Sequence, residues 1–379
     1  MGAGPLEGIR VIDVGGWHTG PAAACMLADQ GAEVIKIEGP GGDAYRPSGT
    51  SRNGIGVGWL AANRNKRFVQ LDLKQPEGLA TLKKLVAKAD VFIHNTIPGA
   101  MARLGLDAET LRAEHPGLIH ASISGFGQTG PYAAEPAFDT LFQALSGLCY
   151  VQGTGGKPAM VKTLVVDKTI SPVLAQAITA ALVKRLRTGE GSTVECSMLD
   201  IFTWWMWPDA MAQMTFIGDE GVRMAAPLSE VDMLAPTDDG YLIVTPHMQH
   251  NWEDFCRIVN RPELLTREGF VTGADRSGNL IEYFREVCAS VKGKTTAEWC
   301  ALFREAGIPN APVLRPEEVP GHPQILHYGS IETVEDPLLG SYLMPRAPVR
   351  IDGVAAGTRR APQLAGVDTE AVLRDWGID

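Results

Sequence analysis

Cysteine is scarce in this sequence, and its placement limits the class of protein. The chain has six cysteines and no Cys-x-x-Cys pair. Scattered single cysteines argue against a disulfide scaffold and predict reduced thiols, so we expect a cytoplasmic protein. The sequence also lacks an apolar run of roughly 20 residues and a basic segment followed by an apolar core. We therefore expect neither a membrane span nor a secretion signal.

Positive charge is in deficit. The 379 residues include 34 Lys and Arg against 44 Asp and Glu, which gives a formal net charge of −10. Nucleic acid and anionic membranes are poor partners for such a chain, and an anionic ligand needs a local basic pocket. With 45% hydrophobic residues, the chain is long enough for one large domain and a smaller one.

Three familiar site motifs are missing or incomplete. The glycine-rich turn at 15–20 has Trp17 where a dinucleotide-binding GxGxxG carries its second glycine, so the signal for a nicotinamide cofactor is weak, although Glu38 stands near the expected ribose acid. No GxSxG nucleophile elbow occurs. His247 and His250 are spaced too loosely with Glu253 to indicate a metal site, and a helix start is the favoured interpretation there.

Alternating strand and helix patterns fill the first half of the chain. Residues 9–14 and 33–38 are apolar strand patterns that flank a helical pattern at 22–30, which makes one βαβ unit. Further strands are predicted at 68–73, 90–94, 118–122 and 192–198. The pattern predicts an α/β fold with a doubly wound parallel sheet that binds ligands at its strand ends.

The pattern changes after residue 200. Residues 201–218 are mostly helical and rich in tryptophan, with Pro208 expected to kink or divide the helix. This stretch predicts a core or subunit interface, and an acyl pocket is the alternative. We predict three segments: a large Rossmann-like domain at 1–222, a small α+β domain at 223–325, and a linker with a return to the large domain at 326–379.

Asp167 follows the apolar run Leu164–Val166. We expect a helix to start after it, with Ser171 as N-cap and Pro172 at the first position, and to end at Gly189. A carboxylate at such a junction is partly stripped of water, which raises its pKa, while the helix N-terminus lowers it. Asp167 is either a simple cap or a reactive group. Likewise, the basic cluster at 63–67 is either a phosphate site or a solvated turn.

Further landmarks recur in order along nearly the whole chain. They are Pro5–Asp13, Gly20-Pro21, Leu27–Glu38, Asn63–Arg67, Leu71–Lys74, Ala89–Val91, Arg103–Leu106, Gly125–Pro131, Thr188–Gly191, Asp239–Tyr241, Glu298-Trp299 and Gly307–Pro309. In these landmarks the sequence resembles the class III CoA-transferases, the family that includes formyl-CoA and crotonobetainyl-CoA transferases.

The resemblance implies a Rossmann-like large domain built from both chain ends, a small domain between them, and two interlocked subunits. It assigns the nucleophile to Asp167, which passes CoA from an acyl-CoA to a free carboxylic acid through an aspartyl-CoA thioester. It implies CoA as substrate, with no permanently bound cofactor and no metal. It places CoA contacts at Trp17, His18, Leu71, Lys74, Asn95, Thr96, Ile97, Arg103 and Asp139.

Three departures from the family pattern keep alternatives open. An arginine of formyl-CoA transferases is Gly39 here, and their glycine-rich active-site loop has no counterpart at 223–227, which argues against oxalate or formate as substrates. Related α-methylacyl-CoA racemases carry a histidine where this chain has Phe138, so racemisation is disfavoured. Besides the homodimeric transferase, the open alternatives are an acyl-CoA racemase or epimerase and a non-catalytic subunit of a heteromeric transferase.

Overall fold

The computed structural model describes residues 4–218 and 220–378, and its contacts divide the chain into two compact units. The sheet unit comprises the described parts of residues 1–146, 161–205 and 323–379. The helical unit comprises residues 147–160 and the described parts of 206–322. Residues 206–222 fall in the helical unit by this division, and the domain boundaries given above remain a prediction.

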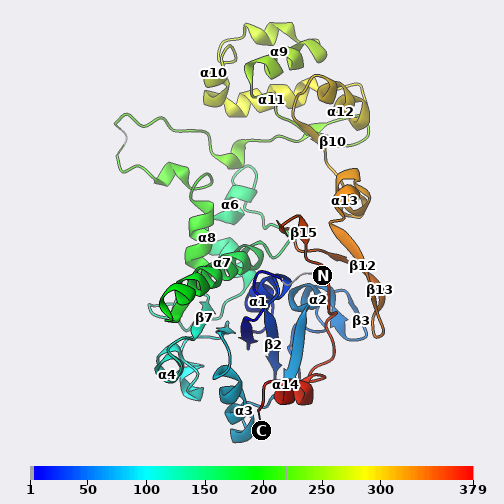
Figure 1. The fold of residues 1–379 in the computed structure, drawn as a ribbon. Coiled ribbons are helices and arrows are strands. Elements are labelled where there is room, and N and C mark those ends of the chain that lie inside the picture. Colours follow the sequence, from blue (N-terminus) through cyan, green and yellow to red (C-terminus); the bar gives the residue numbers. More distant parts are fainter. Residues whose placement is uncertain (1–3, 219, 379) are drawn as a thin grey trace. The chain divides into compact units, whose positions relative to one another are not determined.

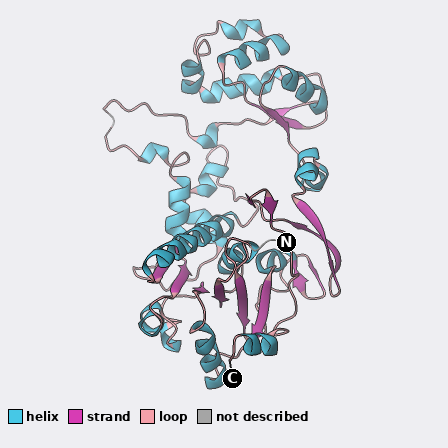
Figure 2. Ribbon diagram, in the orientation of Figure 1, coloured by secondary structure: helices cyan, strands magenta, loops and turns pink. Residues whose placement is uncertain are grey.

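A six-stranded parallel sheet is the centre of the sheet unit (Figure 2). Its strands are β1 (Arg10–Asp13), β2 (Glu33–Glu38), β5 (Lys66–Gln70), β6 (Val91–His94), β7 (Ile119–Ser124) and β8 (Ser192–Ser197). They lie in the order β5-β2-β1-β6-β7-β8, so the chain switches direction across the sheet between β1 and β6. The predicted α/β fold with a parallel sheet is thereby confirmed, and ligands of such sheets bind beside the switch at the carboxyl ends of the strands.

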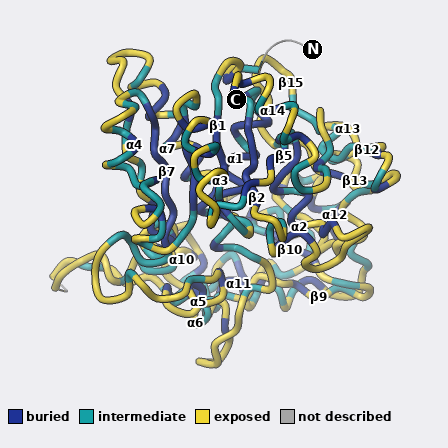
Figure 3. The backbone as a smooth tube through the Cα atoms, turned by 90° about the horizontal axis from the view of Figure 1, so that it is seen from below, coloured by how far each residue is buried: buried dark blue, intermediate teal, exposed yellow. Residues whose placement is uncertain are grey.

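Helices cover both faces of this sheet. The core cluster on one face joins Ile12, Ile35 and Phe92 to α3 (Pro76–Val86) and to α14 (Thr369–Asp375). On the other face, α1 (Thr19–Asp29) packs against α7 (Val165–Thr188). The strands between these layers form the dark blue, buried part of the tube in Figure 3.

Helix α7 is 24 residues long and is the one helix in the described chain with the length and hydropathy of a membrane span. It packs against α1 and against strands β7 and β8. Its buried apolar residues, which include Ile170, Leu174 and Ile178, are explained by this packing, whereas Val183 and Leu186 are exposed.

The C-terminal segment lies beside the N-terminal strands (Figure 1). Helix α14 packs on β5, and the Asp368 carboxylate accepts a hydrogen bond from the backbone N–H of Phe68 at 2.9 Å. The other elements of the sheet unit are β3 (Ser51–Arg52), β4 (Ile55–Gly56), α2 (Val57–Asn63), η1 (Ala102–Leu104), α4 (Ala108–Glu114), α5 (Asp139–Leu145), α13 (Pro323–Tyr328), β12 (Ile331–Asp336), β13 (Gly340–Pro345), β14 (Arg350–Ile351) and β15 (Val354–Ala355).

The helical unit has its own aromatic core, which includes Trp252, Tyr283 and Phe303. A three-stranded antiparallel sheet in the order β11-β10-β9 packs with its helices. The elements of the helical unit are α6 (Leu148–Gln152), η2 (Ala212–Met214), η3 (Leu228–Glu230), β9 (Ala235–Pro236), β10 (Tyr241–Val244), α9 (Gln249–Ile258), η4 (Pro262–Leu265), α10 (Gly273–Gly278), α11 (Leu280–Ser290), α12 (Thr296–Glu305), β11 (Asn310–Pro312) and η5 (Pro316–Gly321).

The tryptophan-rich helix, α8 (Met198–Met206), is shorter than the predicted 201–218. It stops before Pro208 because proline lacks a backbone N–H and disfavours helical geometry in the residue before it. Phe202 is fully buried and stacks on Trp205, whereas Trp204 is 66% exposed.

Candidate active site

Asp167 lies in the first turn of α7, because this helix begins at Val165 and ends with Gly189 as its C-cap. The predicted end was therefore right. The predicted start was wrong: Ser171 is not the N-cap, and Pro172 lies inside the helix. Helix geometry extends back to Val165 because the backbone N–H groups of its first turn find an acceptor that is distant in the sequence.

That acceptor is the buried carboxylate of Asp139, the first residue of α5. Its Oδ2 accepts hydrogen bonds from the backbone N–H of Val166 at 2.8 Å and of Asp167 at 3.2 Å. Its Oδ1 accepts from Nε2 of Gln143 at 2.7 Å. Asp139 therefore acts as the N-cap that α7 lacks in its own sequence, which fixes the backbone from which the Asp167 carboxylate projects.

Two hydroxyl groups connect the start of α1 to the start of α7. Thr19 Oγ1 donates to Oδ1 of Asp167 at 2.7 Å. Ser171 Oγ lies 3.0 Å from the Thr19 carbonyl oxygen and 2.8 Å from the Asp167 carbonyl oxygen, and its single proton is shared between these two acceptors. The two helix starts are therefore pinned together at Asp167.

The surroundings of Asp167 raise its pKa to about 6. Removal from water is the largest cause, and the negative charge of Asp139 acts in the same direction. The hydrogen bond from Thr19 opposes both because it stabilises the ionised form. At neutral pH the carboxylate is therefore largely ionised but poorly solvated, as suits a nucleophile or a proton-transfer group.

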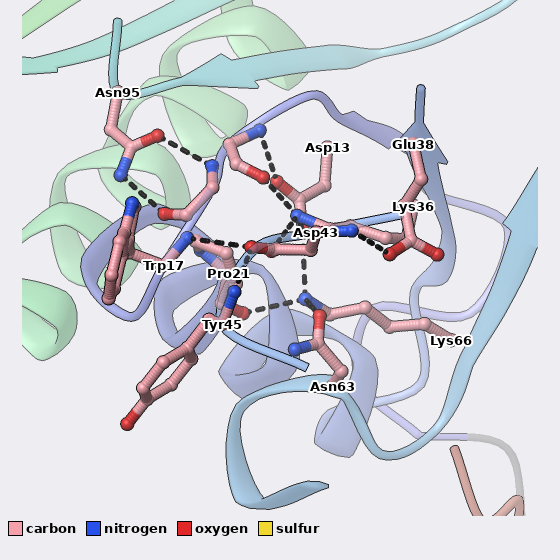
Figure 4. Close-up of polar contacts among 12 residues, drawn as sticks. Asp13, Trp17, Pro21, Lys36, Glu38, Asp43, Tyr45, Asn63, Lys66 and Asn95 are labelled. Atoms are coloured by element: carbon pink, nitrogen blue, oxygen red, sulfur yellow. Dashed lines mark hydrogen bonds and ion pairs between the residues drawn. The ribbon is translucent and has the colours of Figure 1, made fainter. Parts of the chain in front are cut away.

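The turn after β1 is held from three sides (Figure 4). Asn95, which follows β6, accepts from the Gly16 N–H and donates to the Gly16 carbonyl, both at 2.8 Å. Asp43 Oδ1 accepts from the Trp17 N–H at 3.3 Å. Lys36 Nζ, on β2, donates to the Gly15 carbonyl. These contacts hold Trp17 in the left-handed backbone region, with φ at 59°.

Two lysines are fully buried beneath this turn. Lys66 Nζ donates to Asp13 Oδ2 at 2.8 Å, to the Pro21 carbonyl at 2.7 Å and to Asn63 Oδ1 at 2.9 Å. Lys36 Nζ forms ion pairs with Asp13 at 3.8 Å and with Asp43 at 3.4 Å. Two cations are thus matched by two carboxylates, as burial of charge requires.

Aromatic rings surround the turn. The ring centroid of Trp17 is 5.8 Å from that of Tyr45 and 5.8 Å from that of Phe138. The ring centroid of His18 is 6.0 Å from that of Tyr45. Burial lowers the pKa of His18 to about 4, with a further contribution from the positive charge of Lys168. His18 is therefore a neutral imidazole at pH 7, and any contact it makes with a phosphate is a hydrogen bond without a full charge.

The remaining predicted CoA residues follow strands that are close together in the sheet. Lys74 comes after β5, whereas Thr96 and Ile97 come after β6. The side chains of Lys74, Ile97 and Arg103 are exposed, and Leu71 is buried in the core. The sheet order therefore places Lys74, the Trp17 turn and the Thr96 loop along one edge. Lys74 and Arg103 are available to an anionic ligand, but Leu71 offers only its backbone.

The basic cluster at 63–67 has partners within the sheet unit. Arg64 pairs with Asp29 at 2.6 Å and Lys66 pairs with Asp13 at 2.8 Å. Arg67 pairs with Glu33 and Asp375, at 3.0 Å and 2.7 Å. Both interpretations of this cluster, the phosphate site and the solvated turn, were therefore wrong. The cations hold the N-terminal strands, α1 and α14 together, and their acidic partners lie too far away in the sequence for a local pattern to reveal them.

Glu38 is also occupied. Its carboxylate accepts from Arg46 Nε at 2.7 Å and from the backbone N–H of Asp43 at 2.9 Å. A dinucleotide-binding acid must be free to accept from a ribose hydroxyl. Together with Trp17 in the turn, this contact argues against a nicotinamide site.

The loop after β6 covers a cavity of about 230 Å³ in the sheet unit. Asp107, Glu109 and Glu195 are among its lining residues, so it disfavours phosphate groups. His94 and His120 also line it, and burial lowers the pKa of His94 to about 3. Within the described residues, no group of three His, Cys, Asp or Glu side chains has the arrangement of a metal site.

Sequence reasoning missed four residues of this site, namely Thr19, Lys36, Asp43 and Tyr45. One of them left a signal. Lys36 is a charged residue inside the apolar strand EVIKIE, which is a position where a parallel sheet buries both faces. The contacts of Thr19, Asp43 and Tyr45 depend on tertiary structure alone.

The sheet unit thus carries a desolvated carboxylate at Asp167 and two exposed cationic side chains, Lys74 and Arg103. The sequence matches CoA-transferase family III over residues 6–369, and the chain belongs to this family. This confirms the expectation of a class III CoA-transferase.

Similar proteins cover almost the whole chain. The human succinyl-CoA:glutarate CoA-transferase is 31% identical in an alignment of 377 positions that covers 98% of this chain and 86% of that protein. The formyl-CoA:oxalate CoA-transferase of Shigella sonnei is 30% identical in an alignment of 405 positions, gaps included, that covers 98% of this chain and 96% of that protein.

Solved structures agree with the fold. Rv3272 from Mycobacterium tuberculosis has a TM-score of 0.84 at 29% identity, covering 97% of this chain and 98% of that chain. A CAIB/BAIF family protein from Brucella suis has a TM-score of 0.83 at 26% identity, covering 99% of this chain and 100% of that chain.

Proposed function

We propose that this enzyme moves CoA from an acyl-CoA to a free carboxylic acid through an aspartyl-CoA thioester on Asp167. The observation that carries the proposal is the Asp167 carboxylate itself. It lies on a capped helix start, is held through one oxygen at 2.7 Å, and has a pKa raised to about 6. A simple helix cap needs neither the second carboxylate of Asp139 nor the clamp from Thr19.

The reaction consists of four displacements. An oxygen of Asp167 attacks the donor thioester carbonyl and the carbon–sulfur bond breaks, which gives a mixed anhydride and CoA thiolate. The thiolate attacks Cγ of Asp167 and releases the donor acid as its carboxylate. The acceptor carboxylate then attacks Cγ and releases the thiolate. Attack of the thiolate on the acceptor carbonyl forms the new acyl-CoA and regenerates Asp167.

Each attacking group in this sequence is an anion, so the displacements need no proton donor. They need an ionised Asp167 and an environment that excludes water, because water hydrolyses the anhydride and thioester intermediates. A pKa of about 6 meets the first need at neutral pH. Partial burial of the carboxylate supports the second.

Trp17, His18, Lys74, Thr96, Ile97 and Arg103 are assigned to CoA. Lys74 and Arg103 supply positive charge to the phosphates of CoA, since both are exposed. Leu71 contributes only backbone contacts. Asn95 and Asp139 act indirectly, because their polar atoms are already engaged by Gly16 and by the start of α7.

Succinyl-CoA is the first donor to test, because relatives named for succinyl-CoA and glutarate match nearly the whole chain. Phe138 argues against a racemase, since its exposed ring stands where racemases carry a proton-transferring histidine. The intact surroundings of Asp167 argue against a silent subunit.

We also propose that the enzyme is an interlocked homodimer in the cytoplasm. Trp204 and Trp205, exposed on α8, support a subunit interface, because apolar side chains that are grouped on a surface mark interaction sites. Light scattering coupled to size exclusion tests the dimeric state: a mass of twice 40.7 kDa is expected, and 40.7 kDa contradicts a dimer.

The experiment for the proposed function is isotope exchange. The wild-type enzyme is incubated with succinyl-CoA and labelled succinate, and label in succinyl-CoA is measured. We expect exchange that Asp167→Asn abolishes and Thr169→Val retains. Exchange by Asp167→Asn at the wild-type rate overturns the assignment of the nucleophile.

A further inference from the structure

Thr19 is a residue that neither the family resemblance nor the sequence pattern assigns to the reaction. It is 5% exposed and is the first residue of α1. Its hydroxyl has a single proton, which is donated to Oδ1 of Asp167 at 2.7 Å. A buried threonine hydroxyl at a helix start ordinarily bonds to its own backbone, so donation to another helix's carboxylate is a specific arrangement.

The backbone that carries this hydroxyl is held by two further contacts. The Thr19 carbonyl oxygen accepts from Ser171 Oγ at 3.0 Å, and Ser171 lies one turn after Asp167 on α7. Lys66 holds the same end of α1 through the Pro21 carbonyl at 2.7 Å. These contacts fix the backbone at the start of α1, and with it the Cα atom from which the Thr19 hydroxyl projects toward Asp167.

The hydrogen bond from Thr19 makes the two carboxylate oxygens of Asp167 chemically different. Oδ1 carries the hydrogen bond from Thr19, and no donor among the described residues engages Oδ2. An oxygen whose lone pair accepts a hydrogen bond is the poorer nucleophile, so Oδ2 is the oxygen that attacks. Oδ1 then becomes the carbonyl oxygen of the anhydride and of the thioester.

We propose that Thr19 is a catalytic residue whose hydroxyl selects Oδ2 of Asp167 as the attacking atom and stabilises the charge on Oδ1 when Cγ is attacked. This inference rests on the proposed function. When CoA thiolate attacks Cγ of the anhydride, the electron pair of the Cγ–Oδ1 double bond moves onto Oδ1. The Thr19 O–H donates to that oxyanion; the double bond then re-forms as the Cγ–Oδ2 bond breaks and the donor carboxylate leaves.

The test compares Thr19→Val, which keeps the shape and removes the hydroxyl, with Thr19→Ser, which keeps the hydroxyl. The rate of aspartyl-CoA formation from succinyl-CoA is measured by rapid quench and peptide mass spectrometry between pH 5 and 8. Removing an oxyanion donor costs about 100-fold in rate, and we expect this loss in Thr19→Val with recovery to within about threefold in Thr19→Ser.

The pH dependence gives a second readout that a merely structural role does not move. The Thr19 hydrogen bond lowers the pKa of Asp167. Without it, the acid limb of the rate profile is expected to shift to higher pH in Thr19→Val and to stay in place in Thr19→Ser. Thr169→Val is the matched control, because the Thr169 hydroxyl donates to the Val165 carbonyl of the same helix at 2.7 Å.

The outcomes separate the two proposals. If the wild-type protein forms no adduct on Asp167, the proposed function falls. If the wild type forms it and Thr19→Val forms it at the same rate with the same pH profile, Thr19 has no catalytic role. If folded Thr19→Ser, verified by circular dichroism and melting temperature, is as slow as Thr19→Val, the hydroxyl is not the active group and the inference is also overturned.

Discussion

The carboxylate of Asp139 contacts the backbone of Asp167 at the start of α7, where Oδ2 of Asp139 accepts a hydrogen bond from the Asp167 N–H at 3.2 Å. A helix N-terminus normally stabilises an anion in its first turn. Here Asp139 takes those N–H groups, and its negative charge raises the pKa of Asp167. The Asp139 carboxylate therefore holds the start of α7 in place, and its charge keeps the Asp167 carboxylate more basic than the helix N-terminus alone would leave it.

Replacing Asp139 by Asn is expected to shift the acid limb of the activity profile to lower pH. The neutral amide removes the charge that raises the Asp167 pKa, while its oxygen still accepts from the helix. The pH dependence of kcat measures the shift. A limb unchanged from that of the wild type, or moved to higher pH, contradicts the electrostatic role of Asp139.

Asp139→Ala is the companion variant. It removes both the charge and the cap, and loss of an N-cap costs about 1 kcal/mol of stability. Urea denaturation of Asp139→Ala and Asp139→Asn separates the two effects. We expect the alanine variant to be the less stable one.

Asp167→Asn is expected to stabilise the fold at pH 7.5 by about 1 to 2 kcal/mol. This is less than the free energy that corresponds to the whole pKa shift of Asp167, because the carboxylate is partly exposed and solvent screens it. The folded-state pKa, about 6, lies above the ordinary value of 3.8. For an acid, this means that the native state binds the proton more tightly. Stability is therefore greatest below about pH 4 and is lost as pH rises through 6.

The measurement is the melting temperature of both proteins at pH 4 and pH 7.5. The advantage of Asp167→Asn is expected to appear at pH 7.5 and to shrink at pH 4, where the native carboxyl is protonated. An advantage that grows as pH falls would mean that burial does not raise this pKa.

Lys36→Met is expected to destabilise the protein by about 3 to 5 kcal/mol, because it leaves buried Asp13 and Asp43 without one of their cations. Asp43 also accepts from Trp17, so the turn loosens and the KM for acyl-CoA rises. Urea denaturation and steady-state kinetics measure the two effects. Met248→Ala, an exposed change in the helical unit, is the control. A stability loss under 1 kcal/mol contradicts the role of Lys36.

Lys74→Ala and Arg103→Ala are each expected to weaken CoA binding about tenfold or more, because hydrogen bonds to charged groups contribute about 1.5 to 3 kcal/mol. Both side chains are exposed, so the melting temperature is expected to stay unchanged. Calorimetric titration with CoA checks this at two salt concentrations. Lys292→Ala, an exposed lysine of the helical unit, is the control and should bind CoA as the wild type does.

Local patterns predicted much of the sheet. The strand at Glu33–Glu38 has the predicted bounds, because a run of branched apolar residues between turns leaves little choice. The same reasoning misplaced the start of α7, since the cap that decides it comes from Asp139, 28 residues earlier in the chain. It also misread Arg64 and Lys66, whose acidic partners lie on α1 and β1.

The candidate active site was likewise predicted in part from the sequence. Asp167 was named from the resemblance, and its junction with a helix start indicated two opposing effects on its pKa, of which the structure shows that desolvation is the larger. Asp139 and Thr19, which modify this pKa and hold the backbone and the carboxylate of Asp167, belong to other elements, so no spacing in the sequence connects them to Asp167. The contacts of Asp139 and Thr19 with Asp167 exist only in the tertiary structure.

The most direct test of the account is the mass of the peptide that contains Asp167 after incubation with succinyl-CoA and trapping with hydroxylamine. We predict an aspartyl hydroxamate on Asp167 that depends on succinyl-CoA and is absent from Asp167→Asn. An unmodified Asp167 peptide, from enzyme that binds CoA and exchanges label between succinate and succinyl-CoA, would contradict the covalent mechanism.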